Sequence, residues 1–225
     1  MKTIAFLILL FTTAAGLAAR APKPVERANA LLAQMTRDEK ISLAANGGAG
    51  IPRLGIPGLA PSDGPNGVRE GGPGKTAFPN AHIVAASWDR SLAESFGAAI
   101  GAEASGKGYN ILLGPTVNIL RVPEWGRAAE TLGEDPYLAG QIAAAEIRGI
   151  QSQHVMAQVK HFAANNQEIQ RVGNPLGLPP LSPAVDVVVS ERALQEIYFP
   201  AFKAAVQGFR GSAFPGWRRP MGPTA

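Results

Sequence analysis

The sequence of 225 residues contains no cysteine, which excludes disulfide bonds, thiolate metal sites and a cysteine nucleophile. Charged residues are scarce, at 17% of the chain, and the net charge of +4 comes from scattered basic residues. Because there is no basic stripe with interleaved aromatic residues, we expect no nucleic-acid partner. The glycine-rich segment Gly47–Gly50 lacks the preceding strand and following helix of a nucleotide-binding loop, which disfavours a phosphate-binding protein. We expect no metal and no other cofactor.

A signal peptide is predicted for residues 1–21. Lys2 supplies a short positive region, Ile4–Phe11 forms an apolar core, and small residues follow up to Ala21. A membrane anchor is the alternative, but the apolar core is shorter than the ~20 residues that a spanning helix needs. Cleavage after Ala18 and cleavage after Ala21 fit the pattern equally well. We therefore expect a periplasmic or secreted protein that has no stable membrane insertion once the signal peptide is removed.

The rest of the chain alternates between short apolar runs and longer helical patterns. A helix or helix pair is predicted over Val25–Ala45, and Thr36 with Glu39 forms a capping-box pattern within it. The apolar runs that we count as strands lie at Ile56–Ala60, Ala81–Ser87, Tyr109–Leu113 and Val155–Val159. Further helices are predicted at Asp89–Ser105, Pro136–Gln153 and Glu191–Val206, the last one capped by Ser190. This alternation predicts an α/β fold with a parallel sheet, arranged as a (β/α) barrel or as a doubly wound sheet.

Polar residues gather directly after the predicted strands. The run Val155–Val159 ends in Lys160 and His161, and polar residues continue as far as Arg171. Parallel strands deliver side chains to a site at the carboxyl edge of their sheet, although a strand end with a solvated loop explains this one stretch, taken alone, slightly better. Further polar motifs precede it at Ser62–Arg69, Asn110–Pro115, Asn118–Arg127 and Gly133–Pro136.

In this order, the motifs closely resemble the N-terminal domain of the family 3 glycoside hydrolases, the β-glucosidase and β-xylosidase group. The resemblance extends from about Val25 to about Gln207. It implies that residues 22–207 form a partial N-terminal domain, roughly the first half of a (β/α)8 TIM-type barrel. Residues 208–225 form a divergent tail, in which proline, glycine and arginine replace the buried strand with which the family continues. The tail resembles out-of-frame translation or a premature end, and a genuine short tail is the alternative.

The resemblance implies an exo-acting retaining β-glycosidase of carbohydrate catabolism, with a β-glucoside or a small oligosaccharide as its substrate. The substrate-binding residues that it implies are Asp63, Arg69, Arg127, Lys160, His161 and Arg171. A pyranose needs carboxylates that accept from its hydroxyls, and Lys, Arg or His as donors to them. Each residue also has a plainer explanation: Asp63 as a turn residue, Arg127 with Glu130 as a helix-surface pair, and His161 as a core histidine. The resemblance implies that Glu130, Glu134 and Asp135 brace their loop.

The catalytic carboxylates of the family have no counterpart in the sequence. Retaining hydrolysis needs a nucleophile and an acid/base group ~5–5.5 Å apart. The family's nucleophile is an aspartate in a Ser-Asp-Trp motif, which these 225 residues do not contain. The chain would therefore carry the sugar-binding half without the nucleophile. The alternative is a catalytically inactive truncated relic or a carbohydrate-binding fragment.

Lys160 and His161 set a geometric condition on the site. Successive side chains of a strand point to opposite faces, yet the resemblance requires both of these to reach one sugar. We therefore predict an unusual backbone conformation between them, such as a cis peptide. Both side chains should be directed into the pocket that holds Asp63 and Arg127.

Overall fold

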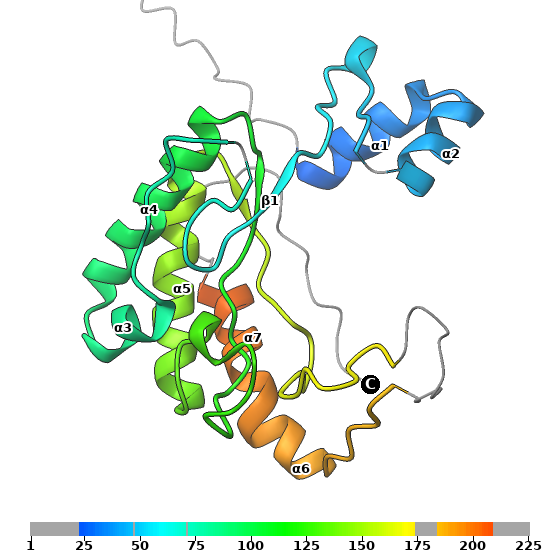
Figure 1. Ribbon diagram of the computed structural model, residues 1–225. Coiled ribbons are helices and arrows are strands. Elements are labelled where there is room, and N and C mark those ends of the chain that lie inside the picture. The colour runs from blue at the N-terminus through cyan, green and yellow to red at the C-terminus, as the bar shows by residue number, and fades with distance from the viewer. Residues whose placement is uncertain (1–22, 47, 71, 174–183, 209–225) are drawn as a thin grey trace, which may run out of the picture. The chain divides into compact units, whose positions relative to one another are not determined.

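The computed structural model describes residues 23–46, 48–70, 72–173 and 184–208 (Figure 1). The predicted signal peptide and the tail from residue 209 onward lie outside the described residues. The described chain divides into two units, one that ends at Gln34 and one that begins at Met35. No helix in the described part of the chain is both long enough and apolar enough to cross a membrane.

The predicted N-terminal helix pair is confirmed as α1, Pro24–Gln34, and α2, Arg37–Asn46. The capping box between them is formed on both sides. The backbone N–H of Thr36 donates to Glu39 Oε2 at 2.8 Å, and the backbone N–H of Glu39 donates to Thr36 Oγ1 at 3.2 Å. Local hydrogen bonding therefore explains where α2 begins.

Three short parallel strands form the sheet, in the order β1-β2-β3: Pro61–Asp63, Ile111–Leu113 and Met156–Ala157. Pro61 lies opposite Ile111, which lies opposite Met156, so the carboxyl ends of all three strands meet at one edge. The parallel sheet and the positions of its last two strands are as predicted, although both strands are shorter than predicted. The first strand was predicted too early, because Ile56 pairs instead with Ile51 in an antiparallel bridge around the 3-10 turn η1, Pro52–Leu54.

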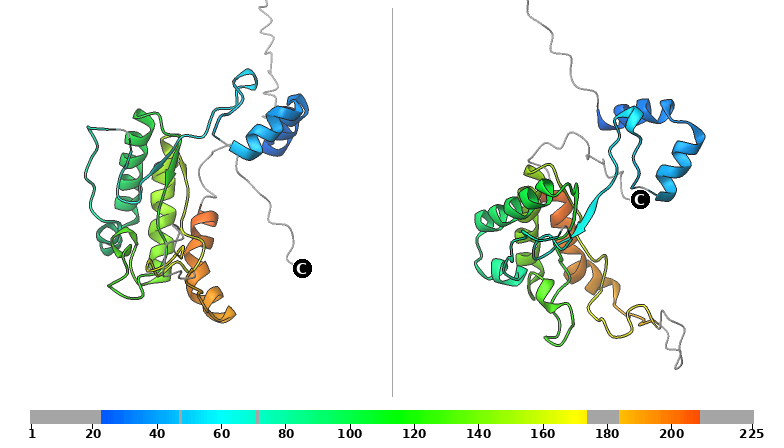
Figure 2. Two further views of the ribbon diagram at one scale, coloured as in Figure 1. Left: turned by 45° about the vertical axis from the view of Figure 1, so that its right-hand side comes forward. Right: turned by 45° about the horizontal axis from the view of Figure 1, so that its top comes forward.

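The helices that connect the strands lie side by side in one row (Figure 1 and Figure 2). Helix α4, Arg90–Gly106, packs against α5, Pro136–Ser152, and α5 packs against α7, Phe199–Gln207. A doubly wound sheet would divide these helices between its two faces. A single row of helices beside strands in sequential order is the arrangement of a (β/α) barrel, which selects the first of the two predicted architectures.

The prediction of a strand at Ala81–Ser87 is wrong. This run forms helix α3, Ala81–Ala86, in which Ala81, Val84 and Ala85 are buried. These positions follow the i, i+3, i+4 spacing of a helix, but a run this short does not separate helix from strand by its pattern. The described residues therefore hold three strands of the sheet where the sequence predicted four.

Aspartate caps start both long helices. Asp89 accepts hydrogen bonds from the backbone N–H groups of Ser91 and Leu92, and Asp135 accepts one from that of Leu138 at 2.8 Å. The expected bracing role of Asp135 is thus a helix cap. The buried positions of α4 are Ala93, Phe96, Gly97, Ile100, Gly101 and Ala104, whereas Leu92 is exposed.

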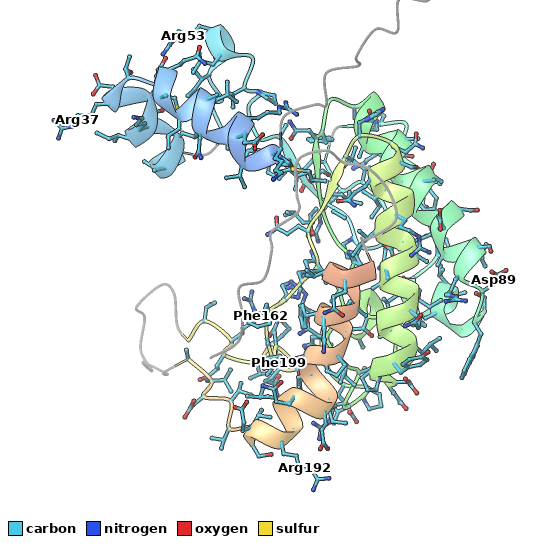
Figure 3. All side chains as sticks on the ribbon, turned by 180° about the vertical axis from the view of Figure 1, so that it is seen from behind. Arg37, Arg53, Asp89, Phe162, Arg192 and Phe199 are labelled. Atoms are coloured by element: carbon cyan, nitrogen blue, oxygen red, sulfur yellow. The ribbon has the colours of Figure 1, made fainter. Side chains whose placement is uncertain are left out.

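The last predicted helix is present with an interruption. Ser190 caps α6, Glu191–Ala193, as predicted, and a π-helical segment η3, Leu194–Tyr198, leads into α7. The ring of Phe162 stacks on that of Phe199, with centroids 5.4 Å apart (Figure 3). It also forms a T-shaped contact with the ring of Phe202. These contacts attach the segment after β3 to α7.

Glu146 is a fully buried carboxyl group on α5, and neither of its oxygens has a hydrogen-bond partner in the described structure. Burial raises the pKa of Glu146 from 4.5 to about 8. Below pH 4.5 this group is neutral in both the folded and the unfolded states. Between pH 4.5 and 8 only the unfolded state releases the proton, so the free energy of unfolding falls over that range.

We predict that Glu146→Gln removes this pH dependence. From pH 4.5 to 8 the wild type should lose on the order of 4 kcal/mol of stability relative to the variant. Urea unfolding of both proteins at the two ends of this range measures the difference. A constant difference between the two unfolding free energies would contradict the buried neutral carboxyl.

Candidate functional site

Asp63 is the last residue of β1 and lies at the carboxyl edge of the sheet. Lys160 Nζ donates to Asp63 Oδ1 at 2.5 Å, and Arg69 Nη1 donates to Asp63 Oδ2 at 2.7 Å. The Lys160 side chain is only 12% exposed, whereas that of Arg69 is 71% exposed. Asp63 therefore holds one buried and one exposed cation, which is more than a turn residue requires.

The main chain brings Lys160 to Asp63 by continuing the sheet beyond β3. Lys160 N–H donates to Pro115 O at 3.0 Å, and Val117 N–H donates to Lys160 O at 2.9 Å. These bonds place Lys160 beside Thr116, in the chain that extends β2. The ion pair therefore joins residues 97 positions apart across the middle strand.

The peptide between Lys160 and His161 is cis, which confirms the predicted unusual backbone at this position. A second cis peptide without proline follows at Phe162–Ala163. Lys160 reaches Asp63 as expected. His161 is half-buried, and its ring Nδ1 lies 3.1 Å from Asn118 Oδ1.

Arg127 forms a two-point pair with Glu130. Its Nη2 and Nε donate to the two carboxylate oxygens at 2.7 and 3.2 Å, and both side chains are largely buried. Glu130 is the last residue of the 3-10 turn η2, Ala128–Glu130, and it also lines the pocket described below. The plainer explanation offered for these two residues, a pair between Arg127 and Glu130, is thus present, although the pair is largely buried and not on the surface.

A pocket of about 340 Å³ opens beside Asp63. Asn66, which lines the pocket, links this loop to two other segments of the chain. Its Nδ2 donates to Ala129 O at 3.1 Å, and its Oδ1 accepts from the N–H of Ala81 at 3.0 Å. The lining residues are Asp63 to Arg69, Lys75, Thr76 and Glu130. Of the six predicted binding residues, Asp63 and Arg69 line this pocket, and Lys160 adjoins it through Asp63. Arg127, His161 and Arg171 are not among the residues that line it.

Arg171 lies at the margin of the site. It pairs with Glu168 at 3.0 Å and is 44% exposed. The side chain of Glu168 lies close to Gly126, where an added Cβ would be 3.7 Å away, so this segment packs beside the Gly126-Arg127 turn. The structure therefore brings Asp63, Arg69 and Lys160 into direct contact, and it holds Arg171 through Glu168.

Charge and burial determine the protonation states at the site. Burial alone would raise the pKa of Asp63, but the hydrogen bond and charge of Lys160, with the charge of Arg69, lower it overall. Burial lowers the pKa of His161 to about 4, and the positive charges of Arg127 and Lys160 act in the same direction. At neutral pH the site therefore contains an ionised carboxylate and a neutral imidazole.

Sequence reasoning missed the residues that hold this arrangement in place. Glu70 accepts from Ser62 Oγ at 2.6 Å and from the N–H of Asp63 at 2.8 Å, and so fixes the end of β1. Asn118 is 3% exposed and makes its hydrogen bonds to His161. Both lie within or directly beside the motifs that were singled out, but a polar side chain that bonds to backbone gives no distinct signal in a single sequence.

The parallel sheet, its row of helices and the charged cluster at its carboxyl edge define an α/β protein of the barrel type with a polar pocket beside that edge. Residues 31–212 match the glycosyl hydrolase family 3 N-terminal domain, and the chain belongs to this family.

Similar proteins are β-glucosidases. The chain is 46% identical over 209 residues to beta-glucosidase BoGH3A of Bacteroides ovatus, a match that covers 85% of the chain and 26% of that protein. It is 42% identical over 195 residues to thermostable beta-glucosidase B of Acetivibrio thermocellus, covering 80% of the chain and 24% of that protein. The chain thus spans about a quarter of the length of these relatives.

Solved structures agree with these matches. DesR, a beta-glucosidase from Streptomyces venezuelae in complex with D-glucose, superposes with a TM-score of 0.71 at 40% identity, covering 81% of this chain and 23% of that one. Beta-glucosidase 3B from Thermotoga neapolitana in complex with glucose gives a TM-score of 0.68 at 38% identity, covering 81% of this chain and 28% of that one.

Proposed function

We propose that this chain provides the sugar-binding part of an exo-acting retaining β-glycosidase, of the β-glucosidase type, in carbohydrate catabolism. The observation that carries the proposal is the Asp63 carboxylate held by Lys160 and Arg69 at the carboxyl edge of the sheet, beside a pocket of about 340 Å³. A carboxylate accepts from two sugar hydroxyls, and the cations beside it donate to hydroxyl oxygens. The glucose complexes of two similar β-glucosidases support a pyranose as the ligand.

The remaining predicted residues extend the proposed subsite. Arg127 and His161 are linked to it electrostatically, because the charges of Arg127 and Lys160 both lower the pKa of His161. Arg171 would contribute from the margin of the site, with Glu168 holding its guanidinium. The proposed substrate is a β-glucoside or an oligosaccharide with a glucose-like terminal unit.

The proposed location of the protein is the periplasm or the extracellular space. The support is the N-terminal pattern of one positive residue, an apolar core at Ile4–Phe11 and small residues up to Ala21. Expression in a bacterial host with cell fractionation and N-terminal sequencing tests this proposal. Recovery of the processed chain outside the cytoplasm is expected, and a chain that retains its first residues in the cytoplasm would contradict it.

Calorimetric titration with D-glucose tests the proposed function directly. We expect saturable binding with a Kd of about 1 mM, which corresponds to about −4 kcal/mol. Sorbitol, an open-chain polyol with a similar number of hydroxyl groups, is the control and should give no saturable heat. Absence of glucose binding by the folded protein, or equal binding of sorbitol, would reject the sugar subsite.

We predict that the 225-residue polypeptide binds glucose without hydrolysing an aryl β-glucoside. Its sequence has no Ser-Asp-Trp motif to supply the nucleophile, and hydrolysis with retention needs two carboxylates. Release of the aryl alcohol should therefore stay at the level of a protein-free blank. Turnover of about 1 per second or more, abolished by a substitution within this chain, would place a complete catalytic pair in it.

The second candidate is an inactive relic or a carbohydrate-binding fragment that keeps the subsite without catalysis. Binding without turnover by the polypeptide is common to both candidates. The DNA directly downstream separates them, because a reading frame that encodes the next strand and a Ser-Asp-Trp motif would restore the enzyme.

A further inference from the structure

The strongest unexplained feature of the site is the side chain of Asn118. It follows β2, is 3% exposed, and holds the main chain of His161 on both sides. Its Oδ1 accepts from the backbone N–H of His161 at 2.7 Å, and its Nδ2 donates to the carbonyl oxygen of His161 at 2.9 Å. Asn118 therefore bonds to the second residue of the cis peptide through both ends of its amide group.

These two bonds determine the orientation of the Asn118 amide group. A backbone N–H only donates and a carbonyl oxygen only accepts, so the oxygen of the amide must face the N–H and its nitrogen must face the carbonyl. The opposite orientation would set two donors against each other and two acceptors against each other. The usual ambiguity between the oxygen and nitrogen of an asparagine is thus resolved here by the main chain.

The same oxygen determines where the imidazole carries its proton. Nδ1 of His161 lies 3.1 Å from Asn118 Oδ1, and a carboxamide oxygen has only lone pairs to offer. Nδ1 must therefore carry hydrogen. Burial lowers the pKa of His161 to about 4, so the ring is neutral at pH 7 and Nε2 has a free lone pair.

We infer that Asn118 is a positioning residue that fixes His161 as the Nδ1–H tautomer, so that Nε2 acts as a hydrogen-bond acceptor for a hydroxyl group of the ligand. The ligand part of this inference rests on the proposed function, whereas the tautomer rests on the Asn118 contacts alone. It corrects the donor role that the sequence predicted for His161. In the described structure Nε2 has no protein partner, and it is not among the buried polar atoms that lack one.

This assignment determines which groups of the site donate hydrogen bonds and which groups accept them. Lys160 is a donor, while Asp63 and His161 Nε2 are acceptors. A hydroxyl group that reaches both Lys160 and His161 would accept from the first and donate to the second, which an ether oxygen or a carbonyl oxygen is unable to do. The pair would thus select for a free hydroxyl at that position of the sugar.

Nitrogen-15 NMR of the histidine rings tests the tautomer in the absence of sugar. The chain has three histidines, so His161→Gln identifies the signals of His161. We expect a protonated Nδ1 and an unprotonated Nε2 at pH 7. Asn118→Asp keeps an oxygen at the same place and should retain this tautomer, whereas Asn118→Leu should lose it. Asn165→Leu, a matched change elsewhere in the same region, should leave it intact.

The wild-type spectrum decides the matter even if Asn118→Leu does not fold. A wild-type His161 protonated at Nε2, or in a solvent-like mixture of both tautomers, would overturn the inference. Addition of D-glucose should then shift the Nε2 signal. If glucose binds in the calorimetric titration but moves no ring nitrogen, the acceptor role of Nε2 is overturned. If glucose does not bind at all, the proposed function fails, and an Nδ1–H tautomer would still establish the positioning role of Asn118.

Discussion

Replacement of Asp63 by asparagine is expected to weaken glucose binding by about 100-fold. The substitution would keep the size of the side chain but remove the charge that faces Lys160, which is only 12% exposed. Hydrogen bonds to a charged group are worth about 1.5–3 kcal/mol, and the upper end of that range corresponds to about 100-fold in Kd. The unpaired Lys160 should also lower the free energy of unfolding by about 2 kcal/mol.

Asp38→Asn is the matched control for this experiment, because Asp38 is an exposed carboxylate in the first turn of α2. It should leave both glucose binding and the unfolding free energy nearly unchanged. Calorimetric titration and urea unfolding of the three proteins measure the two effects. Unchanged glucose affinity in a folded Asp63→Asn protein would remove Asp63 from the proposed subsite.

A large expected loss of stability comes from two glycines where α4 crosses α5. A Cβ added to Gly149 would lie 2.0 Å from the backbone oxygen of Glu94, and one added to Gly97 would lie 2.1 Å from the backbone oxygen of Glu146. Both obstacles are main-chain atoms, which a rotamer change does not move. Gly149→Ala should therefore force the helices apart and cost about 3 kcal/mol or more.

Gly106→Ala is the control in the same pair of helices. Gly106 is the last residue of α4, and an added Cβ there would meet nothing within 4 Å. Its replacement by alanine should raise stability by up to about 1 kcal/mol through helix propensity. Urea midpoints of the two variants should move in opposite directions. Equal stability of Gly149→Ala and the wild type would show that the two helices do not cross this closely.

Local signals in the sequence predicted the elements that depend on local hydrogen bonds. Thr36 with Glu39, Asp89 and Asp135 each begin a helix at the expected place, because a cap acts within one turn. The strand predicted at Ala81–Ser87 is wrong because a run of seven residues fits a buried strand and a buried helix equally well. Short strands such as Met156–Ala157 depend on their neighbours and were predicted too long.

The site was predictable only where a side chain has a strong chemical character. Asp63 and Lys160 are 97 residues apart, and it was the family motifs, not the periodicity, that related them. The unusual backbone at Lys160-His161 was predicted from two things together: the alternation of side chains along a strand, and the family's requirement that both side chains reach one sugar. Glu70 and Asn118 were missed because their partners are backbone groups, whose positions depend on the folded main chain.

The proposed role of this chain is to hold a glucose unit at the carboxyl edge of a partial barrel. The most direct test is titration of D-glucose into the nitrogen-15-labelled protein, followed through its backbone amide signals. The amides of Asp63, Arg69 and His161 should shift together along one saturable curve, while those of α2 stay in place. Signals that remain still at the sheet edge, or that move only elsewhere in a folded protein, would contradict the sugar-binding site.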